Sequence, residues 1–465
     1  MYKPIEDLRY LGKVAQSFHF KKPTNVNVSY LIKIIHNILN NSKHSDFNEQ
    51  NMSKLLLSLA YLKFTQDSLK EHGIADQLLG LVEQYASNLT DKGIFLTEKG
   101  TSNVLWALSS LGYTKSHILD SNIKKCLFDA IYQNKTKITN KGICNVLYTL
   151  DKLGYHKSDL IEESIEKPLF DSINQNAEGI FGHYLSNMFR NLLNFGYTSQ
   201  ELRDKGIHES LFDRLYLCLE TMTAKDLGSI LITLHELGYT RSELKKSNIQ
   251  KEMLKAIGEL GKQTNFKDIY FVLNCTQIMG YRKEHIENTR CQARLLSGLY
   301  ENANKMDDYE FIVYINLLHR LGYTKSNLDS SLNNLLFDVA SSKMKDMSGR
   351  ALEIYAQELC KFGYSEKDLK KIYRLTQNVS DRYLVNPKSS PEELVKVLYQ
   401  MVSDLKQHSE SKNGEKSEKR TAPKRKSHGS SDDGDSHREN YLRFKFDKMP
   451  EDSNNHKQDS GFSFS

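Results

Sequence analysis

The chain has 465 residues, of which 39% are apolar, and its 64 basic and 58 acidic side chains give a formal net charge of +6. A chain of this length fills two or three ordinary domains. Its apolar content is modest for one deep core, so either part of the chain is disordered or the apolar surface is spread thinly. Dense but nearly balanced charge excludes a large uniform basic field, which leaves nucleic-acid binding allowed but not required.

The six cysteines, at positions 126, 144, 218, 275, 291 and 360, show neither a CxxC pair nor a Cys/His ligand spacing. We interpret them as reduced core residues of a cytosolic protein, because free cysteines are usually buried. The first residues lack the apolar segment of a signal peptide, and no stretch reaches the roughly 20 apolar residues of a membrane span. The sequence therefore predicts a cytosolic protein without membrane contact, metal or cofactor.

The N-terminal residues 1–47 are predicted to form a helical cap, with an apolar helix from Leu31 to Leu39. A repeat array is predicted to follow over residues 48–375. The pair Gly-Tyr recurs at 112, 154, 196, 238, 280, 322 and 363, a spacing of 42 residues five times and then 41. An earlier copy ends at Leu62-Lys63-Phe64, where Lys replaces Gly.

Each copy is predicted to begin with a helix that ends at the Gly. Fifteen residues before that Gly, seven of eight copies have a residue whose side chain caps a helix start: Asn48, Thr97, Thr139, Thr223, Asn265, Asp307 and Ser348, with Phe181 as the exception. Apolar residues then recur at helical spacing, as in Ile143, Val146 and Leu147. The Gly suits the left-handed position that ends a helix, and the following aromatic packs over that end.

A second helical segment is predicted to start directly after Gly-Tyr, where Thr198 with Glu201 and Thr240 with Glu243 fit capping boxes. Pro168 indicates that this segment is broken into a short turn and a longer helix. Each unit is thus a helical hairpin that cannot bury its own faces. Stacking about eight units of about 42 residues predicts an all-α fold, a right-handed α-solenoid.

Beyond the array, residues 376–406 are predicted to form a C-terminal capping helix that opens at Ser390-Pro391, and residues 407–465 a disordered charged tail. The tail holds a basic cluster of the kind read as a nuclear-import or nucleic-acid patch: Lys419, Arg420, Lys424, Arg425 and Lys426. Asp432 and Asp433 follow closely, so an ordinary solvated charge run is an equal alternative.

No nucleotide-binding, zinc-protease, hydrolase or calcium-loop motif is present, and we therefore predict that the protein is not an enzyme.

The segment Asn103-Val-Leu-Trp-Ala-Leu-Ser-Ser-Leu-Gly-Tyr113 resembles the core of the octotricopeptide repeats and the related repeats of FAST-kinase-like and RAP-domain proteins. It is also similar to repeat arrays of bacteria that live inside host cells. The resemblance covers about residues 48–375 and implies an α-solenoid that binds single-stranded RNA, roughly one base per repeat. The period differs from that of octotricopeptide repeats and no RAP-like segment is visible, so no nuclease role is implied.

Three positions before the Gly lie on one face of the first helix, away from most of the apolar stripe. Position −13 carries Lys99, Lys141, His183, Lys225, Lys267 and Arg350. Position −9 carries Asn103, Asn145, Asn187 and Ser229. Position −6 varies and carries Trp106, Tyr148, Arg190, Asn274, Asn316 and Gln357. Lysines on phosphates, amides on base edges and a variable residue against each base would suit RNA, but a solvated helix face explains the same pattern.

Two functions follow as hypotheses. The first is a monomeric protein that binds single-stranded RNA along the concave surface of the solenoid. The second is a protein-interaction scaffold in the same groove, an effector secreted by an intracellular bacterium that acts in the host cell and reaches its nucleus through the basic tail.

Overall fold

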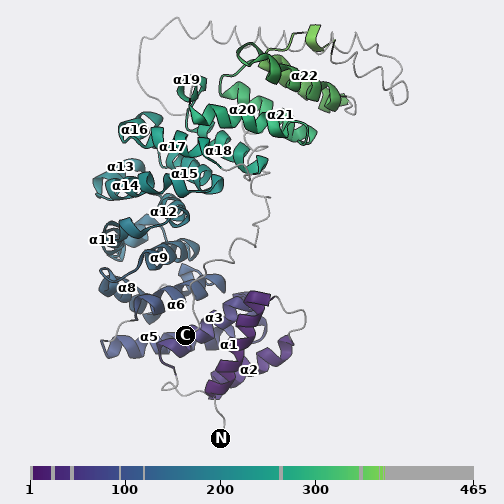
Figure 1. Cartoon of the computed structure of the whole chain (residues 1–465). Helices are drawn as coiled ribbons and strands as arrows, with labels where there is room; N and C mark the ends of the chain where they lie inside the picture. The colour runs from purple at the N-terminus through teal and green to yellow at the C-terminus, as the bar shows by residue number, and fades with distance from the viewer. Residues whose placement is uncertain are drawn as a thin grey trace, which may run out of the picture. The chain divides into compact units, whose positions relative to one another are not determined.

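The computed structural model describes residues 4–21, 27–41, 47–93, 96–118, 121–260, 265–287, 289–344, 349–365, 367–369 and 371. Within these ranges the chain is helical and has no β-strand, so the predicted all-α class is confirmed (Figure 1). The predicted capping helix at 376–406, the tail at 407–465 and its basic cluster from Lys419 to Lys426 lie outside the described residues.

The N-terminal segment has one helix more than the sequence indicated. The predicted apolar helix is α2 (Val28–Asn41), which buries Ile34, Ile35 and Ile38. The additional helix, α1 (Pro4–Lys21), packs against α2 and against the first helix of the repeats.

Each repeat contains a long helix that ends just before the Gly position, and we call these the A helices. They are α3 (Glu49–Tyr61), α6 (Glu98–Ser110), α9 (Asn140–Lys152), α12 (Gly182–Asn194), α15 (Ala224–Glu236), α18 (Phe266–Ile278), α21 (Asp308–Arg320) and α23 (Gly349–Phe362). Successive A helices pack against each other, from α3 through α6, α9, α12, α15, α18 and α21 to α23.

The second segment of each repeat consists of a short helix and a longer one, which we call the B helix. The short helices are α4 (Gln66–Glu71), α7 (Lys115–Ile118), α10 (Lys157–Glu162), α13 (Ser199–Asp204), α16 (Arg241–Lys246), α19 (Lys283–Ile286) and η4 (Lys325–Asn327). The B helices are α5 (Ala75–Asp91), α8 (Asn122–Asn134), α11 (Glu166–Asn176), α14 (His208–Cys218), α17 (Ile249–Gly258), α20 (Arg290–Asn302) and α22 (Ser330–Met344). Single turns η2 (Ala177–Gly179) and η3 (Leu219–Thr221) follow α11 and α14.

The break inferred from Pro168 is therefore present. Pro168 lies in the first turn of α11, where its missing N–H costs no hydrogen bond. The B helices from α5 to α20 pack in series, each against the next. Helices thus contact their equivalents in the neighbouring repeat, and these contacts bury the apolar positions, including Leu147 and Leu150 of α9, which are fully buried.

The predicted helix starts are confirmed by their hydrogen bonds. The side chains of Asn48, Thr97, Thr139, Thr223, Asn265 and Asp307 each accept a hydrogen bond from a backbone N–H of the first turn. Ser348 lies outside the described residues. Phe181 provides no such bond for α12. The capping boxes at Thr198 and Thr240 are also present.

The helix ends have the backbone conformation that the Gly predicted. Gly154 has φ +86° and Gly238 φ +90°, in the left-handed region. Lys63, which replaces the Gly in the first repeat, has φ 64° and so adopts the same conformation with a side chain. The tyrosine that follows is buried, for example Tyr155 and Tyr197.

A main-chain hydrogen bond joins neighbouring repeats at five junctions of the described chain. The first backbone N–H of the short helix donates to the carbonyl of the last residue before the Gly in the following repeat. The bonds are Gln66 to Leu111, Lys115 to Leu153, Lys157 to Phe195, Ser199 to Leu237 and Lys283 to Leu321. Because a helix C-terminus leaves carbonyls without intrahelical partners, this bond satisfies one of them.

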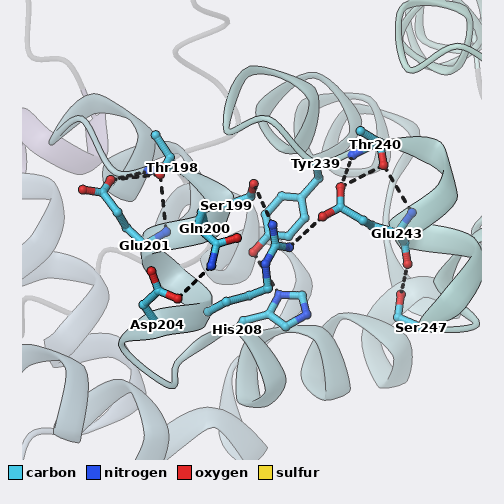
Figure 2. Close-up of polar contacts among 11 residues, drawn as sticks. Thr198, Ser199, Gln200, Glu201, Asp204, His208, Tyr239, Thr240, Glu243 and Ser247 are labelled. Carbon is cyan, nitrogen blue, oxygen red and sulfur yellow. Dashed lines mark hydrogen bonds and ion pairs between the residues drawn. The ribbon is translucent and has the colours of Figure 1, made fainter.

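Side chains reinforce the same junction, as Figure 2 shows for two repeats. The Glu201 and Glu243 carboxylates close the capping boxes of α13 and α16. His208 Nδ1 lies 2.9 Å from the hydroxyl of Tyr239 in the next repeat. Arg203 bridges the two repeats by an ion pair of 2.9 Å with Glu243.

Candidate nucleic-acid interface

One face of the A helices carries the residues singled out from the sequence. Positions −13, −9, −6 and −2 share this face because they lie three or four residues apart. On α6, α9, α12 and α15 we call these sixteen residues the polar stripe. It consists of Lys99, Asn103, Trp106, Ser110, Lys141, Asn145, Tyr148, Lys152, His183, Asn187, Arg190, Asn194, Lys225, Ser229, Ile232 and Glu236.

The centre of the polar stripe is its most accessible part. On α12, His183, Asn187 and Arg190 are exposed, and the imidazole of His183 lies 3.9 Å from the ring of Tyr184, measured between centroids. Lys225 on α15 is also exposed, while Ser229 is half-buried. Three side chains of α12 are therefore open to a ligand.

Helix α9 adds an exposed aromatic ring beside a cation. Tyr148 is 41% exposed, and the Lys152 ammonium lies 5.6 Å from the centre of its ring. Lys141 and Asn145 on the same face are half-buried. An exposed ring next to a lysine is suited to nucleic acid, because a base can stack on the ring while its phosphate binds the ammonium group.

At the α6 end the candidates differ in accessibility. Lys99 is exposed, but Asn103 is only 5% exposed. Trp106 is half-buried, and its ring lies 5.1 Å from that of Tyr61 on α3, centroid to centroid. Packing within the protein therefore accounts for much of the Trp106 surface.

In the later repeats the candidate side chains bind other parts of the protein. Asn274 is 8% exposed and accepts a hydrogen bond of 3.4 Å from Arg320. Asn316 Nδ2 donates to Glu358 at 2.6 Å, and Lys267 lies 3.3 Å from Glu310. Gln357 is half-buried. Arg350 lies in α23, and its side chain is outside the described residues. Exposed candidates thus lie on α9, α12 and α15, together with Lys99 on α6 and Lys267 on α18, whose side chain is 71% exposed despite its ion pair.

Two features of this face were missed in the sequence. Position −2 completes the stripe with Lys152 and with Asn194, which donates to Asp151 of α9 at 2.9 Å. The helical period of 3.6 residues already placed it on the same face. The second is Phe181, whose side chain is 64% exposed. Its departure from the capping pattern was the available signal.

The charge of the polar stripe is predominantly positive. It holds Lys99, Lys141, Lys152, Arg190 and Lys225, besides His183, and its acidic member is Glu236. The polar stripe therefore has five basic side chains and one acidic one, while the rest of these four helices adds three more acids, Glu98, Asp151 and Asp226.

The cysteines are buried, and burial raises the pKa of the Cys144 and Cys291 thiols to about 12, so that neither is a thiolate at neutral pH. No group of histidine, cysteine or carboxylate side chains in the described ranges is arranged to hold a metal ion. None of the described helices is long and apolar enough to cross a membrane.

Comparisons with known proteins were made by family model and by sequence. No family model matches the chain, and no curated protein matches its sequence.

Proposed function

We propose that this protein binds single-stranded RNA along the polar stripe, and that the array is a right-handed α-solenoid of about eight repeats with the stripe on its concave surface. The observation that carries the proposal is the combination on α9, α12 and α15 of exposed cations, an exposed ring and exposed amides. The octotricopeptide-like segment Asn103–Tyr113 supports it as a resemblance.

The side chains divide into two roles. Lys152, Arg190 and Lys225 offer positive charge to the phosphates, which provides affinity without sequence preference. Tyr148 offers a ring on which any base can stack, and the Asn187 amide offers a donor and an acceptor to a base edge. Single strands suit these groups because their bases are accessible.

The proposal is tested by reversing the charge of two stripe lysines. Binding of a fluorescently labelled oligoribonucleotide, measured by anisotropy, should weaken steeply with salt. The double variant Lys141→Glu with Lys225→Glu should lose binding at moderate salt, and the slope of log K against log salt should fall by about 1.4 if each lysine neutralises one phosphate.

A matched control is Lys125→Glu with Lys251→Glu, which reverses two exposed lysines on the B helices α8 and α17. This control has the same net charge change and should keep RNA binding nearly intact. An equal loss of RNA affinity in both double variants, or an affinity that does not change with salt concentration, would count against RNA binding by the polar stripe.

A second candidate function is a protein-interaction scaffold. It is favoured by exposed apolar side chains on the B helices, where Tyr216 is 44%, Leu217 63% and Tyr300 59% exposed. Such residues are typical anchors of protein interfaces. A pull-down from cells whose partners survive nuclease treatment and depend on Leu217 would favour this function, and loss of all partners after nuclease treatment would oppose it.

A further inference from the structure

Phe181 breaks a rule that the other A helices with a described N-cap follow. Its position is the N-cap of α12, where the neighbouring helices α9 and α15 use Thr139 and Thr223 to accept a backbone hydrogen bond. Phe181 makes no such bond, and its side chain is 64% exposed, the most exposed large apolar side chain in the described part of the chain. The fold gains no cap and only a minor part of the possible buried area from this residue, which points to a role outside folding.

The backbone beneath Phe181 is held firmly. The carbonyl of the preceding residue, Ile180, accepts hydrogen bonds from Arg214 Nε and, at 3.3 Å, from Cys218 Sγ. On the other side, Gly182 has no Cβ, and one placed there would lie 2.8 Å from Met222 Cγ. Met222 therefore packs closely under the first residue of α12. A ring presented on a fixed backbone loses little freedom on binding a ligand.

The surroundings of Phe181 favour an anionic ligand with a flat face. The second residues of the helices that pack on either side of α12 are Lys141 and Lys225. The first turns of α9 and α12 hold no acidic side chain, and Asp226 of α15 is engaged with Thr223 in a capping box. One exposed acid, Glu178, precedes Phe181 by three residues. Cations in the first turns of the helices that pack against α12, together with an exposed aromatic ring, match a nucleotide, in which a base is joined to a phosphate.

We propose that Phe181 is a stacking platform for one base of the bound single strand, at the N-terminal end of α12, the helix that carries the exposed His183 and packs against the helix of the exposed Lys225. This inference rests on the proposed function and extends it, since it assigns base contact to a residue outside the repeated columns. The contact is sequence-tolerant, because every base has a face on which a ring can stack.

The decisive variant is Phe181→Thr, which installs the cap that the neighbouring helices already have. Thermal unfolding should show a protein at least as stable as the wild type, since a polar cap replaces a residue that makes none. Anisotropy with the labelled oligoribonucleotide should nevertheless show about tenfold weaker binding, the effect expected from loss of one stacked base. A gain in stability together with a loss of affinity separates ligand contact from a role in folding.

A fluorescence experiment reports on the contact directly. The chain has a single tryptophan, Trp106, so Phe181→Trp in a Trp106→Phe background places one reporter at the platform. This variant should bind RNA at least as well as the Trp106→Phe parent, and its emission should be quenched by the oligonucleotide.

The other possible results distinguish failure of the stacking proposal from failure of the proposed RNA binding. If Phe181→Thr binds RNA as the wild type does while Lys141→Glu with Lys225→Glu does not, the platform is wrong and the proposed function stands. If the wild type binds no RNA, both are wrong. If Phe181→Thr loses a nuclease-resistant protein partner and keeps RNA affinity, the ring is a protein anchor and not a base platform.

Discussion

Residues with a left-handed backbone control the ends of helices. One is the Gly of Gly-Tyr, and in four repeats a second lies ten residues after that position, following the short helix, where Gly73, Ser164, Gly206 and Asn248 have φ between 58° and 71°. The second position was not predicted, because serine and asparagine stand there as often as glycine and hide the shared conformation. Both positions cost a side chain about 1 kcal/mol or more of folding free energy.

Substitutions in opposite directions at the Gly position should therefore change the free energy of unfolding in opposite directions. A Cβ at Gly238 would meet Ser199 Oγ at 3.6 Å, which is ordinary contact, so the cost of Gly238→Ala is confined to the backbone. We expect Gly238→Ala to lower the free energy of unfolding by about 1–2 kcal/mol and Lys63→Gly to raise it by about 1 kcal/mol. Urea denaturation measures both, and a destabilising Lys63→Gly would contradict the argument.

For single residues, the sequence predicted the backbone conformation well but predicted the exposure of the side chains poorly. The caps at Thr97 and Thr139 followed from residue type and register alone. Accessibility did not, since Asn103 is buried in α6 while Asn187, in the same column, is exposed in α12. Burial depends on side chains of the neighbouring helices, which a column of equivalent residues does not contain.

At the scale of the helix, the short helices form several of the ion pairs between repeats. Lys157 at the start of α10 lies 2.5 Å from Glu201 of α13, and Lys325 of η4 lies 2.8 Å from Asp368. The hydrogen bond from Lys157 lowers the pKa of Glu201. Burial raises the pKa of Asp368, but the hydrogen bonds from Lys325 and Ser365 outweigh it and lower that pKa. These carboxylates therefore favour the folded state while ionised.

The histidine at one junction adds a dependence on pH nearer neutrality. Burial and the nearby Arg203 lower the pKa of His208 from its ordinary value of 6.5. The unfolded chain then binds a proton at a higher pH than the folded protein does, so stability should decrease as the pH falls below about 6.5.

This dependence is measurable as the fall in Tm between about pH 7.5 and pH 5.5. A suitable variant removes the titrating group and keeps a hydrogen-bond partner for the Tyr239 hydroxyl. His208→Gln keeps a group able to hydrogen-bond that hydroxyl but cannot titrate. We expect a smaller fall in Tm for His208→Gln than for the wild type. His285 and His319 also have lowered pKa values and leave a residual fall. An unchanged fall in the variant would exclude His208 as a contributor.

At the scale of the molecule, helices contact their counterparts in adjacent repeats, and stability should therefore be transmitted from neighbour to neighbour. Leu147→Ala removes a fully buried side chain of α9 and should cost about 2–5 kcal/mol. Hydrogen exchange followed by mass spectrometry should show faster exchange in α6, α9 and α12 and little change in α21. A uniform increase along all described helices would indicate one cooperative unit.

The regular period was enough to predict a chain of similar helical units, because each unit repeats its caps, apolar positions and helix end. It was not enough to predict the ligand. The same positions of the repeat hold exposed residues on α12 but residues that bind other parts of the protein on α18 and α21, namely Asn274 and Asn316. Only contacts between repeats distinguish these cases.

The main-chain hydrogen bond from Lys115 to Leu153 has a consequence for how such a chain changes length. A bond between backbone atoms does not depend on which side chains stand on either side of it. Duplication or loss of one whole 42-residue unit in the gene would leave the one new junction with a donor and an acceptor in register. Outward side chains are then free to diverge after each duplication, so a lineage can lengthen its binding surface first and adapt each unit later.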